Sequence, residues 1–251
     1  MYPYILTPWG KIQTFSLFVC IGILLMILCV YRSIKDEDDE QAFIFPVIVI
    51  SGLFGFVSAV IADIIFKYIE YSVLKLYGIT FYGGMIGASL MMLILLKLRK
   101  SNTRYSVLEW FNILTPPFIL FHFFGRLGCF FGGCCYGRTS DSIFALPFPD
   151  NPDMNIIHNG LKCYPTQLFE AALLIVIFFA VIRTANRFRT YLCLYAISRF
   201  CIEFLRGDDR GLAFTILSPS QLISLLIILA LIIDYIYRRI GKRTAHRSFS
   251  E

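Results

Sequence analysis

The chain has 251 residues, of which 57% are hydrophobic and only 16% are charged. Soluble domains are typically about 45–50% apolar and about 25% charged, so this composition argues against ordinary soluble domains and predicts an all-α polytopic membrane protein. A net charge of +6 would fit nucleic-acid binding in a soluble protein. Here the distribution of charge along the chain is more informative, and we expect no nucleic-acid partner.

Seven apolar segments approach the length of about 20 helical residues that crosses a hydrocarbon core. Pro116 and Pro117 interrupt the fourth, which membranes tolerate where neighbouring helices satisfy the freed backbone groups. The first has no small-residue cleavage site after it, so we interpret it as an anchor. The sequence therefore predicts a single transmembrane domain over residues 1–251. The predicted spans lie near residues 13–31, 43–66, 79–97, 107–127, 168–186, 190–206 and 219–237.

Basic residues gather in alternate loops between these segments. More than half of the Lys and Arg residues fall near residues 32–35, 97–104, 183–189 and 238–247. By the positive-inside rule these loops are cytoplasmic, which places the N-terminus outside and the C-terminus in the cytoplasm. The segment 128–166, rich in Gly and Cys, and the loop 207–219 are then predicted to face outward.

The sixth segment carries polar residues with helical spacing. Tyr195, Arg199, Glu203 and Arg206 are 4, 4 and 3 residues apart, which places them on one helix face. Charge at the bilayer centre costs about 2.5–3.5 kcal/mol per residue on insertion scales. A helix–helix salt bridge would explain one pair, but two arginines sharing Glu203 leave a positive surplus. We interpret that surplus as a site for an anion.

The fourth segment adds another arginine near the same outer side. His122 and Arg126 are four residues apart, and Gly125 leaves room for close approach of a ligand. Arg126 could simply extend toward the membrane surface. Together with Arg199 and Arg206, however, it predicts a site for a phosphate-bearing lipid head group, because arginine binds phosphate in a bidentate manner.

Two further motifs allow more than one interpretation. In FYGGMIG at 81–87, the glycines favour close helix packing, but Gly83 and Gly84 also suit a backbone approach to a ligand with Tyr82 as a polar partner. The segments YPTQL at 164–168 and SPSQL at 218–222 are typical helix starts. Glu170 is harder to explain in this way because it lies inside an apolar run.

The eight cysteines divide into two groups. Four lie in predicted spans and act as small apolar residues. The other four lie near the outer face, where a disulfide or free thiols are expected. The sequence has no Cys-x2-Cys pair, and adjacent cysteines suit tetrahedral zinc poorly, so we predict no metal and no cofactor. The outer group is Cys129, Cys134, Cys135 and Cys163.

Four segments together resemble the prolipoprotein diacylglyceryl transferase family: FYGGMIG at 81–87, GRLGCFFGGCCYGR at 125–138, YPTQLFEA at 164–171 and YAISRFCIEFLRGD at 195–208. The resemblance implies an enzyme with seven spans in the bacterial plasma membrane, its active site facing the outer leaflet. It would move the diacylglyceryl group of phosphatidylglycerol onto the lipobox cysteine thiol in the signal peptide of a prolipoprotein, so its partners would be membrane lipids and that peptide.

The resemblance also implies roles for individual residues. Arg126 matches the family arginine that contacts phosphatidylglycerol. With it, the expected catalytic residues are Arg199, Glu203, Tyr82 and His122. The expected substrate-binding residues are Arg126, Arg206, Tyr195, Gly83, Gly84, Gly137, Gln167 and Glu170.

Three positions depart from the family pattern. Tyr82 stands where a histidine is usual, Cys129 where asparagine is usual and Cys134 where glutamate is usual. Tyrosine is a poor base at neutral pH, so we hypothesise that His122 replaces the missing base; the alternative is a hydrogen-bonded histidine at a helix interface. The departures leave open a diverged member with another lipid donor or acceptor. A transporter also uses intramembrane charge, but it needs a path to the cytoplasmic side.

Overall fold

In a computed structural model of the chain, the described residues are 3–8, 10–71, 80–99, 104–148, 150, 160–207 and 217–248. Parts of the predicted outward segments, residues 149, 151–159 and 208–216, lie outside this set. The chain divides into two compact units: a larger one of Met1–Met26 and Thr115–Glu251, and a smaller one of Ile27–Leu114. The interpretation as one transmembrane domain stays a prediction.

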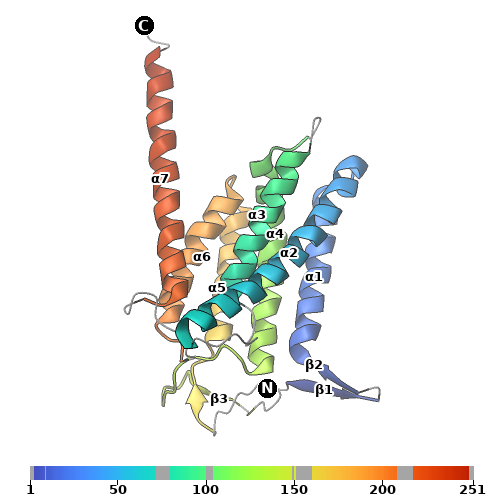
Figure 1. Cartoon of the computed structure of the whole chain (residues 1–251), viewed down its shortest axis with the longest axis vertical. Coiled ribbons are helices and arrows are strands. Elements are labelled where there is room, and N and C mark those ends of the chain that lie inside the picture. The colour runs from blue at the N-terminus through green and yellow to red at the C-terminus, as the bar shows by residue number, and fades with distance from the viewer. Residues whose placement is uncertain are drawn as a thin grey trace. The chain divides into compact units, whose positions relative to one another are not determined.

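The described residues form seven helices and four short strands (Figure 1). The helices are α1 Thr14–Ser33, α2 Asp38–Tyr71, α3 Phe81–Leu98, α4 Val107–Gly132, α5 Thr166–Ile182, α6 Arg187–Glu203 and α7 Pro219–Ser248. Strands β1 Tyr4–Thr7 and β2 Gly10–Gln13 form an antiparallel hairpin just before α1. Strands β3 Leu146–Pro147 and β4 Lys162–Cys163 form a second antiparallel pair between α4 and α5.

Five of these helices are long and apolar enough to cross a membrane: Thr14–Ser33, Asp38–Ile65, Phe81–Leu98, Val107–Gly132 and Pro219–Ile240. They confirm a helical membrane protein and coincide with the first four predicted spans and the seventh. Both prolines of the fourth span lie inside α4, which continues beyond them to Gly132. Helices α5 and α6 have 17 residues each, the lower end of the usual range for a span of about 17–25 residues. The count of seven spans and the orientation stay predictions.

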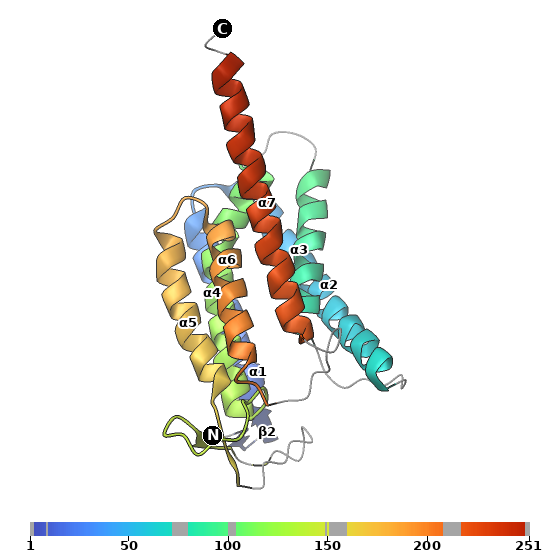
Figure 2. The ribbon, with the colours of Figure 1, turned by 90° about the vertical axis from the view of Figure 1, so that its left-hand side faces the viewer.

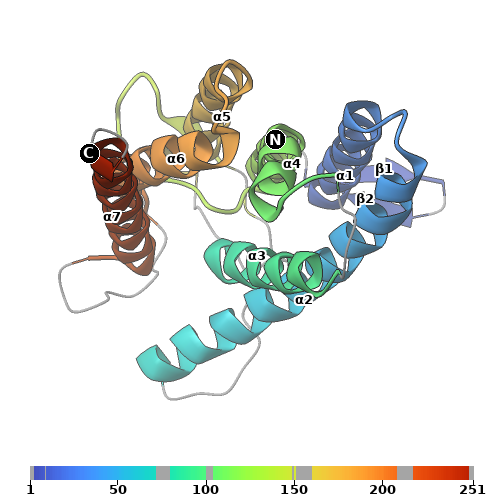
Figure 3. The same cartoon turned by 90° about the horizontal axis from the view of Figure 1, so that it is seen from above.

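Small residues bring α2 and α3 of the smaller unit together (Figure 3). A Cβ atom on Gly83 would lie 2.5 Å from the Cβ of Ala62, and one on Gly84 would lie 3.2 Å from the Cβ of Ala59. The first distance leaves no room for a side chain and the second is tighter than most contacts, so these glycines permit close helix contact. The structure thus supports the packing interpretation of the 81–87 motif. An apolar cluster completes this unit: Val30, Ile34, Ile44, Val47, Leu96, Trp110 and Leu114.

In the larger unit α5 packs against α6, and α6 packs against α7 (Figure 2). The buried positions of α5 recur every three or four residues, as expected for one face of a helix. Leu174, Ile177 and Val181 continue a stripe that begins with Gln167 and Glu170. Two polar side chains therefore start the same buried face that apolar residues complete, and they cannot turn to solvent without rotating the whole helix.

Candidate functional site

Glu170 is the centre of a buried polar cluster in the larger unit. Its side chain is 1% exposed, and its Oε1 lies 2.8 Å from Nη2 of Arg126. Tyr195 donates its hydroxyl hydrogen bond to the same Oε1 at 2.8 Å. Arg199 donates through Nη1 to Oε2 at 3.5 Å. Three helices thus converge on one carboxylate, because α4 supplies Arg126, α5 supplies Glu170 and α6 supplies the other two residues.

Arg199 links this carboxylate to a second one and to α7. Its Nη2 lies 2.6 Å from Glu203 Oε2, one turn further along α6. The same nitrogen donates to the hydroxyl of Ser220, in the first turn of α7, at 3.3 Å. Arg199 is only 2% exposed, so these contacts replace the water that its guanidinium would otherwise bind. We call Arg126, Glu170, Tyr195, Arg199 and Glu203, together with His122, the Glu170 cluster.

The charges of this cluster balance, which corrects one step of the sequence argument. That argument paired the arginines of α6 with Glu203 alone and expected a positive surplus. In the structure Glu170 lies between Arg126 and Arg199, so two guanidiniums face two carboxylates, each side chain at most 8% exposed. Burial of unpaired charge is very costly, and the second carboxylate comes from a neighbouring helix that spacing within α6 could not reveal.

Arg206 does not share the face of α6 that was predicted for it. The helix ends at Glu203, and the amides of Phe204, Leu205 and Arg206 donate to carbonyls three residues earlier. The Leu205 carbonyl then accepts the amide of Arg138 at 2.8 Å. The predicted face is therefore confirmed for Tyr195, Arg199 and Glu203, whereas Arg206 pairs through its backbone with Gly137.

His122 lies inside the cluster with both ring nitrogens beside polar partners. Its Nδ1 is 3.3 Å from the Tyr191 hydroxyl, and its Nε2 is 3.6 Å from Glu170 Oε1. The ring of Tyr195 packs against it edge-on at 5.0 Å between centroids. This environment is that of a hydrogen-bonded histidine at a helix interface, the alternative raised above. Its role as a base stays a prediction.

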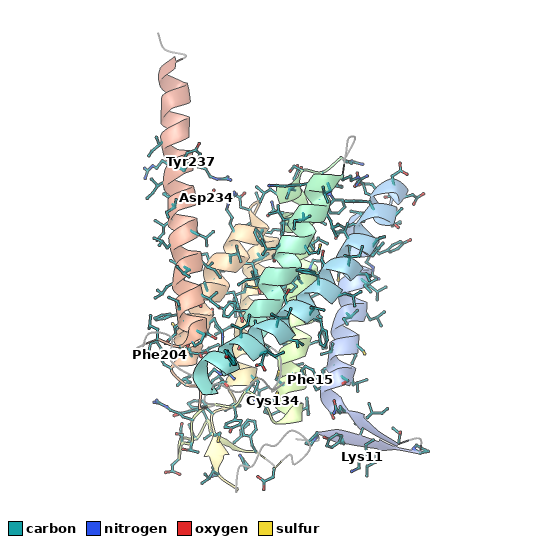
Figure 4. The ribbon with its side chains drawn as sticks, in the orientation of Figure 1. Lys11, Phe15, Cys134, Phe204, Asp234 and Tyr237 are labelled. Carbon is teal, nitrogen blue, oxygen red and sulfur yellow. The ribbon has the colours of Figure 1, made fainter. Side chains whose placement is uncertain are left out.

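The loop after α4 is tied to the start of α5. Gln167 donates from Nε2 to the carbonyl of Cys134, and Thr166 donates from Oγ1 to the carbonyl of Cys135 at 2.8 Å. Both donors are at most 1% exposed. Figure 4 labels Cys134 in this loop. Gln167 thus positions the loop, and Thr166, which the sequence analysis did not single out, does the same from the adjacent position of the YPTQL motif.

Gly137 lies where three backbone segments meet. Its amide donates to the Tyr164 carbonyl at 2.8 Å. A Cβ atom here would lie 2.6 Å from the Leu205 carbonyl oxygen and 2.7 Å from the Cβ of Tyr164. Glycine is therefore required for the loop to pass between the start of α5 and the end of α6. Its predicted contact with substrate stays a prediction.

The two similar helix starts do different work. At α7, Ser218 Oγ accepts the amide of Gln221 at 3.2 Å, and Gln221 Oε1 accepts the amide of Ser218 at 3.0 Å. This reciprocal pair is a capping box, which confirms an ordinary helix start. At α5 the N-cap is Pro165, with no side-chain cap. There Gln167, the counterpart of Gln221, and the adjacent Thr166 hold the cysteine-bearing loop instead.

Three cysteines of that region come together as potential metal ligands. Within the described part of the chain, Cys129, Cys134 and Cys135 form a group whose sulfur atoms all lie within 4.8 Å of one another. All eight cysteines are described, and none of them forms a disulfide in this structure. Cys163 is buried outside this group, and burial raises the pKa of its thiol.

Comparison with known sequences decides the family. Residues 3–237 match the family model described as prolipoprotein diacylglyceryl transferase. The chain belongs to that family. A phosphatidylglycerol–prolipoprotein diacylglyceryl transferase of Clostridium tetani is 28% identical over 91% of this chain and 94% of its own length. The phosphatidylglycerol–prolipoprotein diacylglyceryl transferase of Staphylococcus aureus strain Newman is 29% identical over 92% of this chain and 86% of its own length. The phosphatidylglycerol–prolipoprotein diacylglyceryl transferase 2 of Clostridium perfringens is 33% identical over 63% of this chain and 61% of its own length.

The family match covers both units, including the three remaining residues of the predicted site. Tyr82, Gly83 and Gly84 begin α3 in the smaller unit, where Tyr82 is 4% exposed and its ring lies 6.1 Å from that of Phe81. At the position where the family resemblance led us to expect a histidine, the structure thus has a buried tyrosine. Its catalytic role, and the ligand contacts of the two glycines, stay predictions.

Proposed function

We propose that this chain transfers the diacylglyceryl group of phosphatidylglycerol to the lipobox cysteine thiol of prolipoproteins, in lipoprotein biosynthesis. Membership of the family and the names of the similar proteins support the reaction class. The observation that carries the proposal is the Glu170 cluster, in which residues from three helices hold two guanidiniums inside a membrane protein. Buried arginines of this kind are rare in membrane helices and mark sites for charged ligands.

Arg126 and Arg199 are the proposed contacts for the lipid phosphate. A guanidinium has five N–H donors, so each arginine can keep a carboxylate partner and still donate to a phosphate oxygen. Glu170 orients both groups through contacts of 2.8 and 3.5 Å. Tyr195 and Glu203 fix the two ends of this arrangement. Arg206, half-buried beside the loop at Gly137, adds positive charge for the head group outside the balanced cluster.

The proposed reaction forms one bond and breaks one. The sulfur of the lipobox cysteine attacks the terminal glyceryl carbon, a carbon–sulfur bond forms, and the carbon–oxygen bond to phosphate breaks. The thiol proton goes to a base or to water, and glycerol phosphate leaves with the electron pair. Fixed guanidiniums stabilise the charge that develops on the phosphate. A thiol with a pKa near 8.5 needs only modest help to ionise, for which His122 is the candidate base.

In this proposal the chain spans the plasma membrane of a bacterium seven times, with the N-terminus outside and the site toward the outer leaflet. The basic residues of alternate loops support that orientation. Helices α5 and α6 would be the two short spans. The signal peptide of the prolipoprotein would then present its cysteine on the side where the Glu170 cluster receives the lipid.

A transfer assay with purified protein, phosphatidylglycerol vesicles and a lipobox peptide tests the proposal. We expect a thioether product with the cysteine peptide and none with a serine peptide. Arg126→Ala should lower the rate by about 100- to 1000-fold, the effect of removing a donor to developing charge. Arg104→Ala, in an exposed ion pair of the smaller unit, is the matched control and should retain activity.

Failure to form the thioether with well-folded protein would overturn the proposed reaction. A parallel assay with phosphatidylethanolamine vesicles addresses the diverged-member alternative. Product from that lipid but not from phosphatidylglycerol would show a different donor.

A further inference from the structure

Three thiols converge at the end of α4, although their spacing in the sequence argues against a metal site. Cys129 lies in the last turn of the helix, and the chain then turns back so that the amide of Cys134 donates to the Cys129 carbonyl at 3.2 Å. Cys135 has φ of 62°, a left-handed conformation that non-glycine residues seldom adopt. This turn directs two adjacent side chains toward Cys129, and all three sulfurs lie within 4.8 Å of one another.

Buried residues outside the group hold this arrangement. The carbonyls of Cys134 and Cys135 accept hydrogen bonds from Gln167 and Thr166, which are 1% and 0% exposed. Removing a buried donor of this kind leaves its partner unsatisfied, at a cost of about 1–3 kcal/mol. The two hydrogen bonds therefore fix the loop against α5, and the three thiols are positioned by the fold itself.

The ligand chemistry of three sulfurs selects one class of ion. Zinc–sulfur bonds of about 2.3 Å place tetrahedral thiolates roughly 3.8 Å apart, so the group needs only a small contraction to bind zinc. Thiolates select soft cations such as Zn²⁺ and Cu⁺ over Mg²⁺ or Ca²⁺, which require oxygen ligands. A disulfide would need two sulfurs at about 2.05 Å and would leave the third thiol without a role.

The neighbouring charge fits a bound cation of this class. Three thiolates around a divalent ion carry one net negative charge. Arg126, one turn before Cys129 on α4, interacts electrostatically with Cys129 and Cys135. Its guanidinium would offset the net negative charge of such a complex. Arg126 would thus serve both the Glu170 cluster and the thiol group.

We propose that Cys129, Cys134 and Cys135 form a binding site for a thiophilic metal ion, Zn²⁺ or Cu⁺. Among the described residues the group offers three ligands, so a fourth position in tetrahedral zinc would take water or a thiol from another molecule. Three protein ligands with an exchangeable fourth are typical of catalytic zinc sites, whereas Cu⁺ is satisfied by the three sulfurs alone. This proposal does not depend on the transferase reaction.

Metal binding by the reduced, full-length protein in detergent tests it. After equilibration with Zn²⁺ or, separately, Cu⁺, we expect one ion per chain by elemental analysis. Co²⁺ should give the intense sulfur-to-cobalt charge-transfer absorption of thiolate ligation. Each of Cys129→Ser, Cys134→Ser and Cys135→Ser should weaken binding by at least about tenfold. Cys163→Ser removes a buried thiol of the same unit outside the group, and it should bind as the unsubstituted protein does.

Two results would overturn the proposal. One is the absence of metal from reduced protein that elutes as a single folded species. The other is an unchanged metal content in the variant with all three serines. If that variant does not fold, the three single variants decide the question. Unchanged metal binding in all three of them would also overturn the proposal. The difference between the Zn²⁺ and Cu⁺ titrations identifies the preferred ion.

Discussion

Each unit of the molecule contains a network of arginines and carboxylates, and the two networks differ in position. In the smaller unit, Arg99 pairs with Glu40 at 2.7 Å and Arg104 pairs with Glu37 at 2.9 Å. These residues lie at helix ends or between helices, and the Arg104 side chain is 68% exposed. In the larger unit, the paired charges lie on buried helix faces, with exposures of 8% or less.

The local role of each network explains this difference. Glu40, in the first turn of α2, accepts a hydrogen bond from the amide of Arg104. Its negative charge also interacts favourably with the positive end of the helix dipole. Arg99 packs its guanidinium 4.0 Å from the ring centroid of Phe43. These interactions close helix ends and need no ligand. The Glu170 cluster caps no helix among the described residues. The free-energy cost of burying its charges is therefore better explained by binding of a substrate. Position within the helix, rather than residue type, separates the two cases.

The largest effect that tests this comparison is expected for Glu170→Gln. The substitution leaves Arg126 and Arg199 buried without their shared carboxylate, and breaking a buried charged pair costs about 3–5 kcal/mol. Transfer activity should be lost as well. Glu40→Gln removes one partner of Arg99, which is 17% exposed, and should cost less. Thermal unfolding midpoints in detergent measure both, and equal shifts would contradict the distinction drawn between the networks.

An intermediate effect is expected from the two glutamines of the similar helix starts. Gln167→Ala leaves the buried carbonyl of Cys134 without its donor and should destabilise the protein by about 1–3 kcal/mol. Gln221→Ala removes half of a capping box and should cost about 0.5–2 kcal/mol. Only Gln167→Ala should increase alkylation of Cys134 and Cys135, measured by mass spectrometry. Equal labelling in both variants would show that Gln167 does not position the loop.

The smallest effect is expected for Arg104→Ala, because exposed ion pairs contribute about 0–1 kcal/mol. The neighbouring Tyr105 supplies a pH test of the same region. Its hydrogen bond to Glu37 raises the pKa of Tyr105. A raised pKa in the folded state means that this stabilisation is present below pH 10 and is lost as pH rises through the folded value. Tyr105→Phe should therefore flatten the alkaline limb of the stability profile, and an unchanged limb would exclude this contact as its cause.

The sequence was most informative where a pattern is local. Helical spacing correctly placed Tyr195, Arg199 and Glu203 on one face, and Glu170 was recognised as unusual because it interrupts an apolar run. The contact between Arg126 and Glu170 joins residues on different helices, and no local period contains it. The end of α6 at Glu203 was missed because Phe204, Leu205 and Arg206 favour helix well enough. The carbonyl of Leu205 instead accepts the amide of Arg138 in the loop after α4.

The group of Cys129, Cys134 and Cys135 also shows the limit of local spacing, because here the spacing argued against a site that the fold brings together. Spacing rules for metal sites assume ordinary backbone between ligands, and adjacent cysteines in such backbone point apart. The backbone here is not ordinary, because Cys135 has a left-handed conformation and the chain turns after Gly132. A signal was nevertheless present, because YPTQL and SPSQL differ in what precedes them, and only the first follows a segment rich in Gly and Cys.

The charge balance of the Glu170 cluster has a consequence for discrimination among anions. With two guanidiniums already facing two carboxylates, the cluster has little net attraction for dissolved phosphate or sulfate. An anion that binds Arg126 beside Glu170 is repelled by that carboxylate, so further binding energy has to come from elsewhere in the same molecule. Two acyl chains supply it through their burial in the apolar surroundings. A site whose charges are already balanced would bind soluble anionic metabolites weakly and would select an amphiphile.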